Sequence, residues 1–283
     1  MKEIKIKCPA KLNLSLDVTK KREDGYHELE MIMQTVDVCD YITVSVCDGE
    51  GISLCCDKKD VPLNEKNTAY KAAELFFETV GKTKKVDIII EKHIPQGAGM
   101  AGGSADGAGV LKALNLIENN VLSDEELLNL ALKIGADVPF CLVGGTKLCK
   151  GIGEIMTDVE PMSGVFAIIL KPKVSVSTPK VYAALDEEVL WTHPNTEKLL
   201  KALETGSYED FDTFGGNTLE KPVFREFEII KELKDELKKQ GAIFSLMTGS
   251  GAAVYGIFDD EKTAECALEK TKNKAEEYFL IKL

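Results

Sequence analysis

The sequence has no apolar run that approaches the ~20 residues needed to cross a bilayer. Its first residues alternate isoleucine with lysine and glutamate, which is not the pattern of a signal peptide. No CxxC pair occurs among the eight cysteines, and their irregular spacing argues against a disulfide framework or a zinc site. We therefore expect a soluble, cytoplasmic protein whose cysteines are mostly buried, reduced thiols.

Basic residues are outnumbered, since 35 lysines and arginines stand against 47 aspartates and glutamates, for a formal net charge of -12. Nucleic acids and anionic membranes are polyanions, so such a chain is a poor general binder of either. A small phosphate compound can still be bound locally, through backbone N–H groups and one or two lysines. The charge balance thus favours a small-molecule substrate, with no nucleic acid and no membrane as partner.

The chain also lacks internal repeats, low-complexity tracts and long linkers, and its 283 residues are enough for two domains. Alternating apolar and polar residues predict a strand over residues 3–18, with a break or bulge at Pro9. Helical spacing predicts a helix over residues 68–80 that stops at Gly81. A buried strand over residues 86–94 leads directly into a glycine-rich segment.

The rest of the chain alternates helices with strands. Ser123, with a glutamate three residues later, predicts a capping box at the start of a helix. The periodicity breaks over residues 150–164, and a charged amphipathic helix is expected over residues 225–240. The pattern predicts an α+β fold in two halves, residues 1–155 and 156–283, each a sheet with helices packed on one face.

The most informative segment starts at Pro95 and has the sequence PQGAGMAGGSADGAG. Glycine permits positive φ angles and close backbone approach, so successive N–H groups can converge on an anion. A helix that begins inside or just after this loop directs the positive end of its dipole to the same place. Ser104 adds a hydroxyl that could also meet a phosphate-bound Mg²⁺. The residues predicted to bind ATP are Pro95, Gln96, Gly97, Ala98, Gly99, Met100, Ala101, Gly102, Gly103, Ser104 and Ala105.

The loop is not a Walker A motif, because no lysine precedes a serine or threonine at its end. Nor does it match a dinucleotide-binding GxGxxG with an acidic residue ~20 positions later in a doubly wound sheet. Two structural alternatives stay open, namely a flexible turn and small residues that pack a helix closely on a sheet. The place of the loop between a buried strand and a helix favours phosphate binding over both.

A second glycine cluster, MTGSGAAVYGIF over residues 247–258, lies between two strand-like runs. Such a turn could close over the phosphates or the substrate, although ordinary hairpins often contain glycine. The candidate binding residues in this turn are Thr248, Gly249, Ser250 and Gly251.

Phosphoryl transfer needs charge neutralisation, alignment and activation of the attacking hydroxyl. Asp137 directly follows a helix stop in GADVPF and is the best candidate to accept the hydroxyl proton; the alternative is an ordinary capping or turn aspartate. Lys11 lies on the polar face of the first strand, where it could keep Asp137 ionised, lower the pKa of the alcohol or steady the γ-phosphate. The alternative for Lys11 is a solvated strand lysine.

Together these motifs resemble those of the GHMP small-molecule kinases, which include galactokinase, homoserine kinase and mevalonate kinase. The resemblance covers nearly the whole chain, through the strand with Lys11, the loop from Pro95 and the C-terminal TGSGAAVYGIF. Within this superfamily, PAKLNLSLDV, REDGYHELEMIMQTVD, IPQGAGMAGGSADGA and GADVPFCL are most similar to the 4-diphosphocytidyl-2-C-methyl-D-erythritol kinases. The combination of AKLNL with DGYHEL is quite specific to that family.

The resemblance implies a two-domain fold with the active site in the inter-domain cleft. It implies transfer of the γ-phosphate of ATP, with Mg²⁺, to the 2-hydroxyl of the cytidine-diphosphate-linked methylerythritol, a step of non-mevalonate isoprenoid biosynthesis. Lys11 and Asp137 fall on the catalytic positions of the family. The implied substrate-binding residues are Asn13, Tyr26, His27 and Tyr182, with the two tyrosines on either face of the cytosine ring.

Other functions stay open. Another GHMP kinase, acting on homoserine, mevalonate or a sugar, would have no use for Tyr26, His27 and Tyr182. A nucleotide-binding module without chemistry would keep the glycine loop and would not need Lys11 and Asp137. Outside the family, Tyr26 and His27 would be a solvated loop pair, and Tyr182 a core or interface tyrosine. No metal site of protein ligands is predicted, and we expect a monomer or a weak homodimer.

Overall fold

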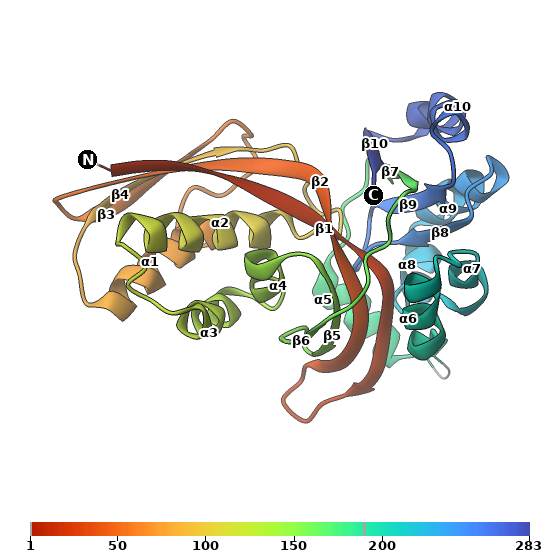
Figure 1. The fold of residues 1–283 in the computed structure, drawn as a ribbon, viewed down its shortest axis with the longest axis horizontal. Helices are drawn as coiled ribbons and strands as arrows, with labels where there is room; N and C mark the ends of the chain where they lie inside the picture. The colour runs from red at the N-terminus through yellow and green to blue at the C-terminus, as the bar shows by residue number, and fades with distance from the viewer. Residues whose placement is uncertain (1, 189–190) are drawn as a thin grey trace. The chain divides into compact units, whose positions relative to one another are not determined.

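The computed structural model describes residues 2–188 and 191–283, and the chain divides into two compact units (Figure 1). Unit 1 comprises the chain up to Ala10, Asp37–Ile94 and Ala101–Gly144, and unit 2 comprises Lys11–Val36, Pro95–Met100 and Gly145–Leu283. Two long strands, β1 (Lys2–Lys21) and β2 (His27–Cys47), each continue from one unit into the other. The predicted division after residue 155 stays a prediction.

Unit 1 is built on a sheet in which β4 lies between β2 and β3. β4 is antiparallel to the second half of β2 and parallel to β3. Val86, Ile88 and Ile90 alternate along β4 as buried residues, as expected for a strand with one face on a core. Helix α1 packs against α2, α3 and this sheet, and α2 packs against α4. The bounds are β3 Gly51–Cys56, β4 Lys85–Glu91, α1 Thr68–Val80, α2 Gly102–Ile117, α3 Asp124–Ile134 and α4 Val138–Val143.

The helix ends of unit 1 follow from their capping residues. The side chain of Asn67 accepts a hydrogen bond from the backbone N–H of Ala69, and Gly81 ends α1 with a φ of 65°. At α3, Ser123 and Glu126 form the reciprocal capping box. The helix predicted to stop at Gly81 and the predicted capping box are therefore confirmed.

Unit 2 contains two groups of paired strands. The first half of β2 pairs with β5, and β5 pairs with β6, all antiparallel. A separate antiparallel sheet has the order β10-β7-β9-β8, and α9 and α10 pack against it. The strands are β5 Thr146–Gly151, β6 Ile155–Asp158, β7 Phe166–Lys171, β8 Phe244–Met247, β9 Val254–Phe258 and β10 Glu277–Lys282. The helices are α5 Thr178–Asp186, α6 Thr196–Thr205, α7 Asp210–Phe214, α8 Glu220–Glu226, α9 Glu228–Lys239, α10 Glu261–Thr271 and η1 Lys272–Lys274.

The predicted α+β class is confirmed, with a sheet and packed helices in each unit. Within the described ranges, no helix combines the length and the apolar character needed to cross a membrane.

Three elements differ from the sequence prediction. β1 is continuous through Pro9, because a strand tolerates proline where no neighbour needs its missing N–H. The helix predicted over residues 225–240 is two helices, which meet at Phe227 in a non-helical conformation with a φ of -128° and a ψ of 78°. The strand predicted up to Ile94 ends at Glu91.

Glycines in the body of α2 let this helix approach its neighbours closely. A Cβ built on Gly109 would overlap Sγ of the buried Cys8 on β1. A Cβ on Gly107 would lie 3.3 Å from the backbone oxygen of Thr68 on α1, tighter than ordinary contact. The close-packing interpretation of the small residues is therefore correct for these two glycines, which follow the residues predicted to bind ATP.

We predict that Gly109→Ala lowers the free energy of unfolding by ~1–3 kcal/mol, because the added methyl group has no space beside Cys8. Urea denaturation measures the change. Gly103→Ala is the matched control on the same helix, since its Cβ would lie 3.4 Å from Oγ1 of Thr68, and alanine is the better helix former. Equal effects of the two substitutions would contradict the overlap.

Candidate active site

The glycine-rich segment adopts a conformation that favours glycine at two of its positions. Gly97 and Gly99 have φ angles of 61° and 71°, and Ala101 has a φ of 60°. Ala101 is the N-cap of α2 and supplies no side-chain hydrogen bond to the helix. The first N–H groups of α2 thus lack the usual side-chain cap, which is the arrangement that suits an incoming anion.

In unit 2, the first half of this segment lies directly on the second glycine cluster. The backbone oxygen of Gly97 accepts from the N–H of Ala252 at 3.0 Å, and that of Ala98 from Ala253 at 3.2 Å. A Cβ on Gly99 would overlap the backbone carbonyl of Thr248. The two glycine clusters, ~150 residues apart in sequence, are therefore in backbone contact, which requires glycine at position 99.

Lys11 and Asn13 lie at this contact and are buried. Nζ of Lys11 donates to Oδ1 of Asn13 at 2.6 Å and to the backbone oxygen of Gly99 at 2.9 Å. Oδ1 of Asn13 also accepts from the backbone N–H of Gly249 at 2.9 Å, and the N–H of Asn13 donates to Oγ1 of Thr248 at 3.1 Å. Since Lys11 is only 3% exposed, the interpretation as a solvated strand lysine is wrong.

The second cluster itself is held by side chains of unit 2. Thr248 is fully buried, and Oγ of Ser250 lies 2.7 Å from Oγ1 of Thr178 on α5. Nδ2 of Asn217 donates to the backbone oxygens of Met247 and Gly249 at 2.8 and 2.7 Å. The turn is thus fixed on both sides by hydrogen bonds and is not a flexible hairpin tip.

Asp137 belongs to unit 1, where it immediately precedes α4. It occupies the N-cap position with a half-buried side chain, but makes no capping hydrogen bond to the helix. The capping interpretation of Asp137 is therefore wrong, whereas the interpretation as a turn aspartate stays open, because residues 136–137 form a turn.

The residues predicted to bind cytosine are partly brought together. His27 is buried, and its ring centroid lies 4.8 Å from that of Tyr182 at an interplanar angle of 32°. Tyr26, in the turn before β2, is 61% exposed. The solvated-pair interpretation is therefore wrong for His27, while the predicted cytosine sandwich stays a prediction.

Sequence reasoning missed the residues that surround His27. Nε2 of His27 lies 2.8 Å from Oδ1 of Asp186, and Lys21 binds the other oxygen of the same carboxylate at 2.6 Å. The indole ring of Trp191 lies 6.4 Å from the ring of His27. Trp191 could have been singled out from the sequence, because it is the one tryptophan of the chain. Nothing in the sequence marks Asp186 and Lys21, because they pair across two segments that are distant in the chain.

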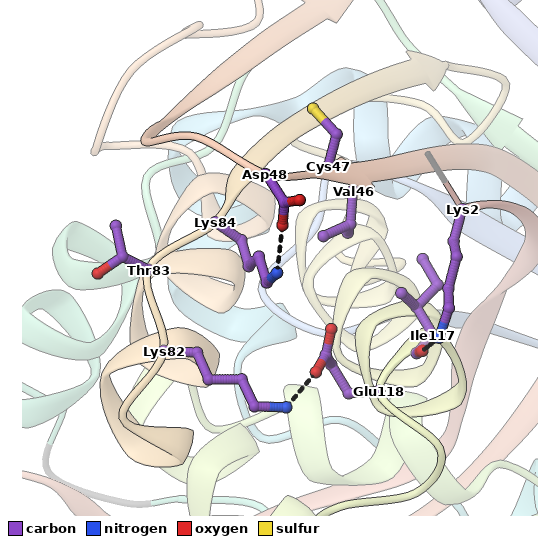
Figure 2. Close-up of a pocket in the computed structure, with 9 residues that line it drawn as sticks. All are labelled: Lys2, Val46, Cys47, Asp48, Lys82, Thr83, Lys84, Ile117 and Glu118. Carbon is purple, nitrogen blue, oxygen red and sulfur yellow. Dashed lines mark hydrogen bonds and ion pairs between the residues drawn. The ribbon is translucent and has the colours of Figure 1, made fainter.

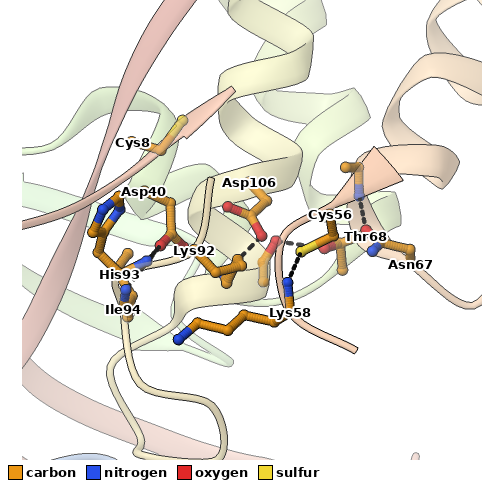
Figure 3. Close-up of polar contacts among 12 residues, drawn as sticks. Cys8, Asp40, Cys56, Lys58, Asn67, Thr68, Lys92, His93, Ile94 and Asp106 are labelled. Carbon is orange, nitrogen blue, oxygen red and sulfur yellow. Dashed lines mark hydrogen bonds and ion pairs between the residues drawn. The ribbon is translucent and has the colours of Figure 1, made fainter. Parts of the chain in front are cut away.

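A buried charged cluster joins the segment after β4 to the helix that follows the glycine loop (Figure 3). Nζ of Lys92 binds carboxylate oxygens of both Asp40 and Asp106, the latter at 2.8 Å. The other oxygen of Asp40 accepts from the backbone N–H groups of His93 and Ile94 at 2.6 and 2.8 Å. The cluster therefore connects β2, the segment directly after β4 and the first turns of α2 within unit 1.

The pKa values of Asp106 and Lys92 in this cluster depart from their ordinary values. Burial, together with the neighbouring Asp40 carboxylate, raises the pKa of Asp106 to about 7, although Lys92 opposes the shift. Burial would lower the pKa of Lys92, but the two carboxylates outweigh it and hold that pKa above its ordinary value. Burial and the nearby second carboxylate thus favour the protonated form of Asp106.

A pocket of ≈ 590 Å³ lies elsewhere in unit 1, at the C-terminal ends of α1 and α2 (Figure 2). Lys2 donates to the backbone oxygen of Ile117 at 2.7 Å, a favourable contact at the C-terminal end of α2. Lys82 forms an ion pair with the side chain of Glu118. Lys84 pairs with Asp48 at 2.7 Å. The lining residues are Lys2, Val46, Cys47, Asp48, Lys82, Thr83, Lys84, Ile117 and Glu118, all different from the predicted site residues.

Comparison with known proteins identifies the family. The GHMP kinase N-terminal domain matches residues 67–145, and the GHMP kinase C-terminal domain matches residues 198–276. A 4-diphosphocytidyl-2-C-methyl-D-erythritol kinase of Clostridium novyi (strain NT) is 45% identical over 96% of this chain and 97% of that protein. The chain belongs to this kinase family.

Solved structures agree with the sequence relatives. A crystal structure of 4-(cytidine 5'-diphospho)-2C-methyl-D-erythritol kinase matches with a TM-score of 0.83 and 34% identity, covering 98% of each chain. Homoserine kinase from Cytophaga hutchinsonii matches with a TM-score of 0.80 over 100% of this chain and 96% of the other, and at 19% identity it shows the fold alone. The predicted family and two-domain GHMP fold are confirmed, and the chain is a phosphotransferase with an alcohol group as acceptor.

We predict that Asp106→Asn changes how stability depends on pH. The folded pKa of Asp106 is raised to about 7, above the ~3.9 of an unfolded aspartate, so stability of the parent falls as pH rises through this window. The stability of the variant should rise relative to that of the parent as pH increases from ~5 to ~7, by up to ~1.4 kcal/mol for each pH unit. Urea denaturation across this pH range, with the exposed Asp259→Asn as control, measures the effect. Parallel pH curves for parent and variant would contradict it.

Proposed function

We propose that this kinase transfers the γ-phosphate of ATP to the 2-hydroxyl of 4-diphosphocytidyl-2-C-methyl-D-erythritol, giving the 2-phosphate and ADP. The step supplies an isoprenoid precursor in the non-mevalonate pathway. The observation that carries the proposal is the buried Lys11, whose Nζ binds the backbone oxygen of Gly99 inside the glycine-rich loop. Together with the names of relatives 42–45% identical to the chain, this supports a catalytic lysine set against bound phosphates.

Lys11 is proposed to neutralise charge on the transferring phosphoryl group. A lysine carries a compact charge, and a site shielded from water strengthens its interaction with a phosphate. Asn13 supports this role, because its Oδ1 accepts from Lys11 and from the N–H of Gly249. Lys11 is thereby held between the two glycine clusters. We also propose Asn13, Thr248, Gly249, Ser250 and Gly251 as residues that line the substrate side of this contact.

Asp137 is proposed as the base that accepts the proton of the attacking hydroxyl. Carbon 2 of the acceptor carries a methyl group, so its hydroxyl is tertiary and sterically hindered. Such a nucleophile depends on alignment and on removal of its proton as the new O–P bond forms. Asp137 suits that task, because its half-buried carboxylate has a fixed position directly before α4.

The phosphates of ATP are proposed to bind from Pro95 to Ala105, at the uncapped start of α2. Ser104, in the first turn of this helix, fits a Mg²⁺ ion that arrives with the nucleotide, because Mg²⁺ prefers oxygen ligands and usually keeps waters and substrate phosphates around it. When bound, the ion would reduce the negative charge on the β- and γ-phosphates. The lysine and the backbone N–H groups do the remaining positioning.

The cytosine ring is proposed to bind beside His27, with Tyr26 and Tyr182 on its two faces. Stacking of a base on an aromatic side chain contributes ~1–3 kcal/mol in single-strand binding proteins. The 61% exposure of Tyr26 leaves its ring surface available for such stacking. We further infer that the enzyme acts in the cytoplasm as a monomer or weak homodimer. Its net charge of -12 supports a small-molecule substrate over nucleic acid.

An ADP-release assay with Mg²⁺-ATP tests the reaction. The cytidine compound is offered in parallel with homoserine, mevalonate and galactose, and turnover of the cytidine compound alone is expected. Proton-coupled ³¹P NMR of the product then locates the phosphate, because an ester of the tertiary hydroxyl has no hydrogen on its carbon to couple with phosphorus. Turnover of another acceptor, or splitting by such coupling in the ³¹P signal of the newly added phosphate, would overturn the proposal.

We predict that Asp137→Asn reduces kcat by a factor of ~10²–10⁴, the usual contribution of a general base, while ATP still binds. Steady-state kinetics and calorimetric titration with ATP measure the two quantities. Asp124→Asn, an exposed aspartate in the first turn of α3, is the control and should keep the parental kcat. A kcat within a few-fold of the parent in the Asp137 variant would remove Asp137 from the role of base.

A further inference from the structure

A carboxylate that the sequence did not single out fixes the ring of His27 in unit 2. Oδ1 of Asp186, the last residue of α5, lies 2.8 Å from Nε2 of His27. Oδ2 of the same carboxylate accepts from Nζ of Lys21 at 2.6 Å. Each carboxylate oxygen has its own partner, so Asp186 cannot rotate without losing one of the two bonds. The side chain of His27 is 7% exposed and that of Asp186 is 23% exposed, so the imidazole is shielded from water while the carboxylate is partly open to it.

The position of Asp186 is set by tertiary contacts. The C-terminal end of a helix carries partial negative charge, and the last turn of α5 contains no basic residue that would offset an aspartate there. The compensating groups come from other segments, namely Lys21 from β1 and His27 from β2. Nε1 of Trp191 donates to the backbone oxygen of Leu185 at 3.1 Å and holds the helix end beside them.

The contact with Asp186 determines which nitrogen of His27 carries a proton. Burial raises the pKa of Asp186, but the hydrogen bonds from Lys21 and His27 outweigh it and hold that pKa below its ordinary value. An ionised carboxylate can only accept hydrogen bonds. Nε2 of His27 is therefore the protonated nitrogen, and in the neutral ring Nδ1 carries the lone pair and can only accept.

An acceptor at Nδ1 distinguishes the two common pyrimidines. Cytosine carries an amino group at position 4, which donates, whereas uracil carries an oxygen there, which accepts. We propose that Asp186 is a positioning residue that makes the site select cytidine over uridine nucleotides, by holding the Nε2–H of His27 and leaving Nδ1 as an acceptor for the 4-amino group. This inference rests on the proposed function, because it requires the base to bind beside His27.

Asp186→Asn is the informative substitution, because Lys21 dictates how the new amide is oriented. The ammonium group of Lys21 is a donor only, so it retains the amide oxygen, and the amide NH₂ then faces Nε2 of His27. Nε2 must now accept, which moves the ring proton to Nδ1. The ring then offers a donor where the parent offers an acceptor, and this donor fits uracil and opposes cytosine.

Binding of cytidine 5'-diphosphate and uridine 5'-diphosphate is measured by calorimetry and by the fluorescence of Trp191, the one tryptophan of the chain, whose ring lies 6.4 Å from that of His27. The parent should prefer the cytidine compound by at least ~10-fold, as expected when a mismatched base leaves a polar group unpaired. In Asp186→Asn this preference should fall ~10-fold or more. Glu187→Gln removes the same charge one residue further along and should keep the parental preference.

The protonation state of His27 is read directly by ¹⁵N NMR of the imidazole nitrogens, with His27→Asn assigning its signals among the three histidines. The parent should show a protonated Nε2 and an unprotonated Nδ1 at alkaline pH. Because this spectrum needs only the parent protein, it tests the inference even if Asp186→Asn does not fold.

The outcomes separate this inference from the proposed function. A protonated Nε2 in the parent, with a cytidine preference lost in Asp186→Asn and kept in Glu187→Gln, supports it. A proton on Nδ1 in the neutral ring of the parent, or an unchanged preference in Asp186→Asn, overturns the role of Asp186 while phosphorylation of the cytidine substrate still stands. Equal binding of the two diphosphates by a parent that phosphorylates the cytidine substrate also overturns it. Absence of that turnover, by contrast, overturns the proposed function itself.

Discussion

A backbone contact that leaves no room for a side chain organises the candidate active site in unit 2. Gly99 lies against the carbonyl of Thr248, and a Cβ on Gly249 would come within 2.8 Å of the oxygen of Gly99. Because the two segments touch through their backbones, Lys11 can reach the oxygen of Gly99 while Asn13 reaches the N–H of Gly249. The buried lysine, its asparagine partner and both turns therefore depend on glycine at these two positions.

The glycines of the loop and those of α2 are required for different structural reasons, although they form one motif in the sequence. Gly97 and Gly99 have positive φ angles and shape the loop itself. Gly107 and Gly109 lie in regular helix and are needed for space, beside α1 and Cys8. The phosphate-binding and close-packing interpretations of the motif are thus complementary, and each applies to its own part of the segment.

Sequence reasoning succeeded where a feature is local. The first helix could be predicted to its last residue because Gly81 ends it in the left-handed conformation, and the capping box of α3 is contained in four residues. The break at Phe227 escaped prediction, because the helical periodicity of residues 225–240 continues across it. Burial of Lys11 was equally invisible, since a strand with polar residues on one face has the same pattern whether that face meets water or another segment.

The negative net charge of the protein does not prevent it from binding an anionic ligand, because charges in salt solution interact only over short distances. A net charge of -12 would repel a polyphosphate if it acted as a whole, but salt screens exposed charges beyond ~8 Å. Buried groups are screened much less, so the charges close to the site determine whether an anion binds there. At the contact of the two glycine turns, the buried side chain of Lys11 and the backbone N–H groups of the loop supply the positive charge and the hydrogen-bond donors. Buried acids elsewhere are paired with lysine, as Asp40 is with Lys92. An acidic surface is therefore compatible with an anionic substrate, provided that the acids are kept out of the site or neutralised beside it.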